Sequence, residues 1–418
     1  MNAQPWNPRF LRPSVRRLAA CCAGLLATPL ALAIEVPRGA PVGGAEAGYA
    51  VAVGGTRLAY GAPGETADAG AAYVAECADE VCAAPQRVVP AGLEARDLYG
   101  FALALDGDTL AVGAPGDREG AVYLFVRSGG TWVQQAKLRP FDGRNGDEFG
   151  AALDLEGDRI LVGARGADDD RGAAYVFLRS GGAWALDARL QPAGLVERSR
   201  FAHDVALSAD TIVAGAPFVR GAGDGWARGA AFVYARGAGW AQQAQLPSGS
   251  VANGAQFGFS VDVEGERAVV GAPGGDGFRG TVQVFERSGA TWSQAALLTA
   301  TGLQPGHAFG WSLALDGPRL RIGTPFFATG AAACGRLHGF DLVGGSWTEV
   351  TPIPSLLVQP RETGAFAVAS RGGRLALGLP GQDRGGVALS GGVRWYDPAR
   401  YAFGDGYESA PVAVAPPA

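Results

Sequence analysis

The hydrophobic pattern of this chain alternates with a period of two, and the alternating runs recur in blocks. The clearest block spans residues 151–190, where two runs flank a Glu-Gly-Asp turn and two more flank a Gly-Gly turn. This alternation predicts antiparallel strands with one buried face, and the Gly-containing turns suit tight hairpins. The predicted strands of this block are 151–155, 159–163, 173–178 and 184–190.

Seven copies of the block share one internal spacing. A Gly-Ala-Pro-like step always lies 14 residues after an aromatic-Gly-like step, whereas the distance between copies varies from 50 to 56 residues. A constant block inside a variable period indicates a rigid core joined by adjustable loops, and degenerate end copies are usual in such arrays. The blocks begin at Ala47, Tyr99, Phe149, Phe201, Phe257, Phe309 and Gly364, and their Gly-Ala-Pro-like steps at Gly61, Gly113, Gly163, Gly215, Gly271, Gly323 and Gly378.

One four-stranded sheet cannot bury both of its faces, but seven sheets packed around an axis can. We therefore predict an all-β fold, a seven-bladed β-propeller of four-stranded antiparallel blades over residues 34–398. The seventh copy lacks a fourth strand, so we expect the spare N-terminal strand at 34–36 to complete the last blade. A Trp begins the fourth strand in five copies and should pack between blades: Trp132, Trp184, Trp240, Trp292 and Trp347.

The residues at these steps resemble a known repeat. The first step reads Phe149-Gly150, Phe257-Gly258 and Phe309-Gly310, and the second reads Gly113-Ala114-Pro115, Gly215-Ala216-Pro217 and Gly271-Ala272-Pro273. Over residues 34–397 the chain resembles the FG-GAP repeat of integrin α-subunit β-propellers and their exported bacterial relatives. The resemblance implies a propeller that recognises a partner through the loops of one face.

The sequence does not predict the calcium sites that integrin-type repeats contain. The loops between the first and second strands, such as 155–158, are too short to wrap an ion with six or more oxygens. The loop residues Asp168, Asp169 and Asp170 form the one acidic cluster able to bind a cation, and a solvated turn is the alternative. We expect no cofactor and no metal site, with calcium the one candidate.

Residues 1–33 are typical of a secretory signal peptide, with a basic start, an apolar run at 18–32 and an A-x-A cleavage site, Ala31-Leu32-Ala33. Removing them, with their four Arg and no acidic residue, changes the formal net charge from −5 to −9. This charge argues against a nucleic-acid partner, and we expect no membrane insertion after cleavage. We expect a secreted, periplasmic or cell-surface monomer, with a Pro/Ala-rich tail at 399–418.

Cysteine use agrees with export. Cys77 and Cys82 flank a short loop between two strand-like runs, which predicts a hairpin disulfide in an oxidising compartment. Cys334 is left over, either as a partly buried thiol or as a site of intermolecular pairing.

The loops between the second and third strands contain 4 to 11 residues, whereas the other hairpin turns are short and uniform. Recognition usually lies on the variable loops of a rigid scaffold, so we assign ligand binding to this face. The alternative is ordinary loops whose aromatic side chains fold over the blade tops. The candidate ligand-binding residues are Asp117, Arg118, Asp169, Arg171, Phe218, Arg220, Trp226, Phe278, Arg279, Phe326 and Phe327.

Catalytic motifs are absent from the sequence, and its three histidines, His203, His307 and His338, suit structural positions. We therefore expect a non-enzymatic binding or adhesion propeller whose partner is a protein or a glycan. The alternative is a secreted propeller hydrolase or lyase acting on polysaccharide, which a cluster of carboxylates in the central channel would favour. A structural envelope protein is the third possibility.

Overall fold

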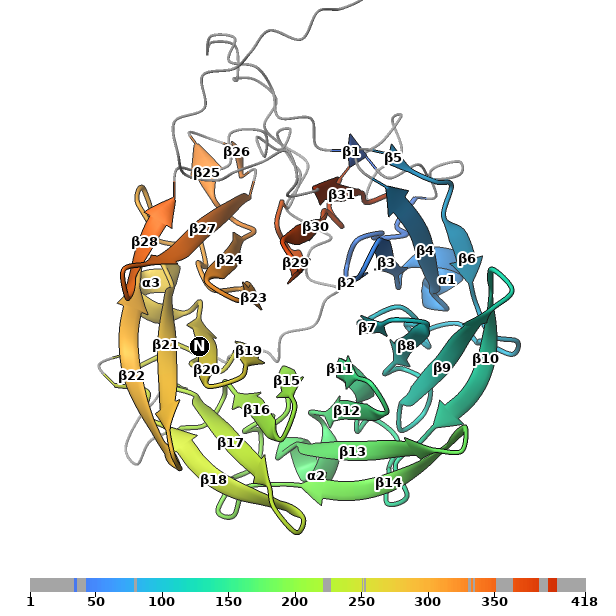
Figure 1. The fold of residues 1–418 in the computed structure, drawn as a ribbon, viewed down its shortest axis with the longest axis horizontal. Coiled ribbons are helices and arrows are strands. Elements are labelled where there is room, and N and C mark those ends of the chain that lie inside the picture. The colour runs from blue at the N-terminus through green and yellow to red at the C-terminus, as the bar shows by residue number, and fades with distance from the viewer. Residues whose placement is uncertain are drawn as a thin grey trace, which may run out of the picture.

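The computed structural model describes residues 34–35, 43–78, 81–220, 227–249, 251, 253–329, 332–333, 335–350, 364–382 and 390–396. These residues form seven antiparallel sheets around a central axis (Figure 1). The prediction of an all-β, seven-bladed propeller is therefore confirmed. The predicted signal peptide, the C-terminal tail, Trp226 and Cys334 lie outside the described residues.

The first four blades follow one another along the chain, each beginning with its innermost strand. Blade 1 contains β2 (Val51–Gly54), β3 (Arg57–Ala62), β4 (Ala71–Ala78), β5 (Val81–Cys82) and β6 (Gln86–Val88). Blade 2 contains β7 (Leu103–Asp106), β8 (Thr109–Ala114), β9 (Ala121–Ser128) and β10 (Thr131–Leu138). Blade 3 contains β11 (Phe149–Glu156), β12 (Arg159–Ala164), β13 (Ala173–Ser180) and β14 (Ala183–Leu190). Blade 4 contains β15 (Val205–Ser208), β16 (Thr211–Ala216), β17 (Ala230–Arg236) and β18 (Trp240–Leu246).

The remaining three blades complete the ring. Blade 5 contains β19 (Ser260–Glu264), β20 (Arg267–Ala272), β21 (Thr281–Ser288) and β22 (Thr291–Leu298). Blade 6 contains β23 (Ser312–Asp316), β24 (Arg319–Thr324), β27 (Arg336–Val343) and β28 (Ser346–Val350), beside the small pair β25 (Ala328–Thr329) and β26 (Ala332–Ala333). Blade 7 contains β29 (Ala367–Arg371), β30 (Arg374–Gly378) and β31 (Val393–Tyr396).

Within the ranges given above, the helical segments are single turns in three of the loops between second and third strands. They are α1 (Glu65–Asp68), α2 (Ala167–Asp170) and α3 (Gly275–Phe278). In the described part of the chain, no helix has the length and apolar character needed to cross a membrane.

The N-terminal segment β1 (Ile34–Glu35) pairs with β31 through two residues, Ile34 opposite Trp395 and Glu35 opposite Arg394. Closure of the ring by this segment stays a prediction. The predicted hairpin disulfide is present, because Cys77 and Cys82 are bonded and face each other across β4 and β5.

The two halves of the repeat motif meet across each blade boundary. A side chain at Gly113 would place its Cβ only 2.0 Å from the carbonyl oxygen of Gly150 in the next blade. Gly120 bridges Phe149 in parallel, and the Phe149 ring is fully buried in the core between blades 2 and 3. The motif therefore consists of an aromatic anchor on one blade and the glycine that lets the neighbouring backbone approach it.

The tryptophans at the start of the fourth strands also join blades. The Nε1–H of Trp184 donates to Gln135 of blade 2 at 2.9 Å, and that of Trp292 donates to Gln243 of blade 4 at 2.8 Å. Trp240 makes the equivalent bond to Asp187 at 3.1 Å. For these three tryptophans, the predicted packing between blades is confirmed.

A further contact joins the blades at the turn between first and second strands. Glu156, at the end of β11, accepts a hydrogen bond from the N–H of Ala209 in blade 4 at 2.6 Å. Arg159, at the start of β12, donates to the carbonyl oxygen of the same residue. We call this arrangement the inter-blade clasp, because one blade holds both backbone groups of a residue in the next. The clasp recurs between blades 5 and 6. There Glu264 accepts a hydrogen bond from the N–H of Gly317 at 2.6 Å, and Arg267 donates to the carbonyl oxygen of Gly317 at 3.4 Å.

The arginine half of the clasp alternates with a threonine over blades 1 to 5. Arg57 of blade 1 and Arg374 of blade 7 also donate to the turn carbonyl of the following blade, at 2.7 and 3.3 Å. Blades 2 and 4 carry Thr at this position instead, and each Thr accepts a hydrogen bond from an arginine of the third strand in the following blade. These pairs are Arg179 with Thr109 at 3.0 Å and Arg287 with Thr211 at 3.1 Å.

Candidate functional site

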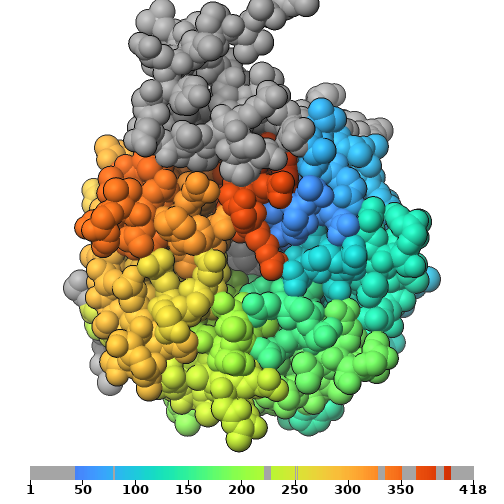
Figure 2. All heavy atoms as spheres, in the orientation of Figure 1, coloured from blue at the N-terminus to red at the C-terminus, as the bar shows by residue number. Residues whose placement is uncertain are grey.

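The innermost strands of all seven blades surround a cavity of about 540 Å³ on the propeller axis. It corresponds to the hollow at the centre of the ring in Figure 2. Its wall is formed by β2, β7, β11, β15, β19, β23 and β29 and the residues just before them. Each of these strands runs from the variable-loop face toward the face with the clasps, so both ends of the cavity can be assigned to a face.

A ring of aromatic side chains surrounds the cavity at the variable-loop end. In each blade the relevant residue lies two positions after the start of the repeat block, and neighbouring ring centroids are 4.6 to 5.6 Å apart. We call this ring the aromatic collar; its members in order are Phe101, Tyr49, Phe366, Trp311, Phe259 and His203. Because consecutive rings touch, the collar narrows this end of the channel.

Blade 3 breaks the collar with Ala151, and Arg165 fills the gap. Its guanidinium lies 5.4 Å from the ring centroid of Phe101, and its Nε donates to the carboxylate of Glu148. Arg165 is 7 % exposed. Burial alone would raise the pKa of Glu148, but the charge of Arg165 and this hydrogen bond hold it below its usual value.

His203 is the polar ring of the collar. Burial lowers its pKa to about 3, and the nearby charge of Arg165 acts in the same direction. The imidazole is therefore neutral at physiological pH. Its Nδ1 lies 3.1 Å from the carbonyl oxygen of Phe259, so this nitrogen carries the proton and Nε2 is a hydrogen-bond acceptor.

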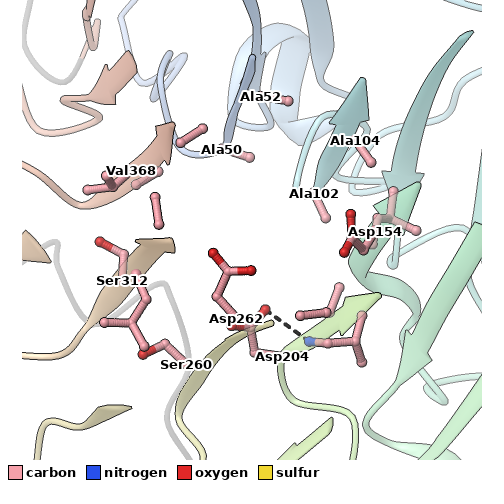
Figure 3. A pocket seen from close by; sticks show the side chains of 18 of the residues that line it. Ala50, Ala52, Ala102, Ala104, Asp154, Asp204, Ser260, Asp262, Ser312 and Val368 are labelled. Atoms are coloured by element: carbon pink, nitrogen blue, oxygen red, sulfur yellow. Dashed lines mark hydrogen bonds between the residues drawn. The ribbon is translucent and has the colours of Figure 1, made fainter. Parts of the chain in front are cut away.

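Below the collar, three aspartates lie around the same central space (Figure 3). Each carboxylate accepts one hydrogen bond from the backbone N–H of the following residue and one from the inner strand of the next blade. The bonds between blades run from Leu207 to Asp154 at 2.6 Å, from Val261 to Asp204 at 2.8 Å and from Leu315 to Asp262 at 2.7 Å. These carboxylates therefore fasten blades 3 to 6 to one another along the channel.

The same three carboxyl groups are difficult to ionise. Burial raises the pKa of Asp154 to about 6, that of Asp204 to about 7 and that of Asp262 to about 8. Neighbouring carboxylates add to this effect, since Asp154 and Asp204 both raise the pKa of Asp262. Groups that titrate near neutral pH can donate or accept protons. Within the described ranges, no group of three or more His, Cys, Asp or Glu is placed to hold a metal ion.

Two of the candidate loop residues predicted from the sequence lie on the collar. The Phe218 ring lies 6.0 Å from that of His203, and the Phe326 ring lies 5.2 Å from that of Trp311. Phe327 is 7 % exposed and packs instead on His307, at 4.4 Å between ring centroids. The structure therefore brings loop aromatics from blades 4 and 6 to one end of the channel.

The other candidates are not gathered in this way. Asp117 is 8 % exposed and forms ion pairs with Lys137 at 2.8 Å and Arg139 at 2.7 Å, within its own blade. Phe278 is 52 % exposed on α3. Of the charged candidates, Arg118, Asp169 and Arg220 are exposed, while Arg171 and Arg279 are half-buried and paired with Asp169 and Asp276.

Sequence reasoning missed the collar, Arg165 and the three channel aspartates as functional residues. Two features of the sequence could have indicated the collar and Arg165. The collar occupies a constant position in the repeat register, and Arg165 replaces the Pro that six other blades carry. The raised pKa values had no signal in the sequence, because they depend on burial in the closed ring.

Comparison with known proteins agrees with this architecture. Three segments match the FG-GAP repeat family: residues 85–125, 132–177 and 240–285. Each segment runs from the last strand of one blade to the third strand of the next, so the repeat is offset from the blade by one strand. The protein is thus a seven-bladed propeller that contains FG-GAP repeats. No curated protein matches the chain.

Proposed function

We propose that this protein is an exported, monomeric binding propeller that takes a protein or glycan ligand on its variable-loop face, at the aromatic collar. The observation that carries the proposal is the collar itself. Six rings from six blades meet at the start of the inner strands, and the loop residues Phe218 and Phe326 pack on them. Concave aromatic sites with a few polar groups are typical of ligand recognition.

Export to a secreted, periplasmic or cell-surface location is part of the same proposal. The signal-like sequence of residues 1–33 supports it, and so does the disulfide between Cys77 and Cys82, because such bonds persist in oxidising compartments.

The second candidate function is hydrolysis or elimination on a polysaccharide. The channel carboxyl groups favour it, because pKa values of about 6 to 8 suit acid–base chemistry at neutral pH. The hydrogen bonds from these carboxylates to the next blade favour a structural role instead. We therefore rank binding above catalysis.

The test of the proposed function is a binding screen of the purified protein against glycan and extracellular-protein arrays, with and without calcium. A ligand of the collar should be weakened by Trp311→Leu, which removes an aromatic face but keeps apolar bulk. It should be unaffected by Phe278→Leu, the control on the same face outside the collar. Loss of binding with Phe278→Leu alone would contradict the proposal. Turnover of a polysaccharide that Asp204→Asn abolishes would establish the enzymatic alternative.

A further inference from the structure

The collar contains one cation, and most of its hydrogen-bonding capacity is unused. A guanidinium has five N–H donors, and that of Arg165 uses Nε to bind Glu148. Its two terminal nitrogens make no hydrogen bond within the described part of the chain. The side chain lines the cavity, although it is only 9 % exposed. Arg165 is therefore a buried cation whose remaining donors are available to the channel.

The fold does not require an arginine at this position. The equivalent residues in the other blades are Pro63, Pro115, Pro217, Pro273, Pro325 and Pro380. Burying a cation costs free energy unless it is paired, and here a single carboxylate, Glu148, provides the pairing. Glu148 and the Phe101 ring also hold the guanidinium in one orientation. Such a fixed, costly group points to a ligand that it recognises.

We propose that the collar binds an acidic sugar, with Arg165 holding the carboxylate of a hexuronate unit and the aromatic rings packing on the sugar ring. The planar fork of a guanidinium matches a carboxylate through two parallel hydrogen bonds. The guanidinium covers the Phe101 ring, and the half-buried Tyr49, whose ring centroid lies 4.8 Å from that of Phe101, offers an apolar ring surface close to the fork. This inference rests on the proposed function and names the ligand class of the same site.

Other groups in the cavity suit the hydroxyls of a sugar. The neutral His203 presents Nε2 as an acceptor on the far side of the gap that Arg165 fills. The carboxyl group of Asp204 follows directly along the wall, and those of Asp154 and Asp262 lie two positions further along their inner strands. An anionic group therefore fits at the collar, where the cation is, and hydroxyl groups fit below it, where the acceptors are.

The experiment is titration calorimetry of the purified protein with a trimer of galacturonic acid. The comparison ligands are the methyl ester of that trimer, a galactose trimer and acetate. We expect the acid trimer to bind roughly 30-fold more tightly than its ester, which is the usual effect of a charge-assisted, bidentate pair. Arg165→Pro, the residue of the other blades, and Arg165→Gln should both remove this preference. Arg144→Gln, which changes an exposed arginine in the loop between β10 and β11 on the same face, should keep it.

The outcomes separate this inference from the proposed function. Equal affinity for the acid and the ester, equal affinity for acetate, no binding of any sugar, or an unchanged preference in both Arg165 variants would each overturn the hexuronate assignment. A different ligand from the arrays that is weakened by Trp311→Leu would still support the proposed function. Melting temperatures of all variants show whether each has folded.

Discussion

The channel carboxyl groups should make the propeller less stable as the pH rises toward neutrality. Asp262 has a pKa of about 8 in the folded protein, against an ordinary value of 3.8. Between these two pH values the folded chain keeps a proton that the unfolded chain has released. Because the folded state binds more protons in this window, its free energy of unfolding falls as the pH rises.

The magnitude follows from proton counting. One carboxyl group that is protonated only in the folded state contributes a slope of about −1.4 kcal/mol per pH unit. Asp262→Asn cannot titrate, so between pH 5 and pH 7 its stability should fall less steeply than that of the wild type by about this amount. Asp154 and Asp204 titrate in the folded protein near pH 6 and 7 and add a negative slope in both proteins. His203 and His338, whose pKa values burial lowers to about 3 and 4, add a positive slope below about pH 6.5 in both proteins, so the difference between the two slopes is the quantity that tests Asp262.

Urea unfolding at half-unit steps from pH 4.5 to pH 8.5 measures this difference. The control is Ser260→Ala, on the same strand, which removes a hydrogen bond to Gly310 of the next blade but no titrating group. It should lower stability and leave the pH slope unchanged. Identical slopes for the wild type and Asp262→Asn between pH 5 and pH 7 would refute the reasoning.

Three other predictions concern the joints of the ring. Glu264→Ala should lower stability by about 1 kcal/mol and speed hydrogen exchange at the Gly317 amide, and unchanged protection there would show that the clasp contributes nothing. Replacing both disulfide cysteines, Cys77 and Cys82, by Ser should cost about 2 kcal/mol in denaturant unfolding, because the closed loop is short; reductant should reproduce the effect on the wild type only. Deleting Ile34–Glu35 should lower the melting temperature by exposing the edge of β31, and an unchanged melting temperature would contradict closure by this segment.

The fold was predictable because the sequence repeats its register. The constant spacing within each block defined the blades, and the strands expected in residues 151–190 coincide with β11 to β14 to within two residues at each end. The disulfide was predictable from two cysteines on either side of one loop. These features are local, so they depend little on how the blades meet.

The site was less predictable because it forms only between blades. Asp154 and Asp262 share a position in the repeat, five residues after the block start, but Asp204 lies three residues after its own. Only the closed ring shows that all three face one channel. The clasps have the same property: Glu156 and Arg159 suggest no more than a tight turn until the next blade is placed beside them.

The alternation of the arginines has a consequence for the number of blades. The junctions from blade 1 to 2, from 3 to 4 and from 5 to 6 use an arginine of the second strand, and the two junctions between them use Thr109 and Thr211. In a closed ring with an odd number of blades, two kinds of junction cannot alternate all the way round, so at least one junction must break the pattern. Blade 1 has the arginine kind on both sides, because Arg374 reaches it from blade 7. The junction from blade 6 to blade 7 fits neither kind, because blade 6 carries Arg319 rather than Thr and Asp316 accepts hydrogen bonds from the amides of Gly372 and Gly373. The irregularity that an odd ring requires is thus found at both junctions of blade 7.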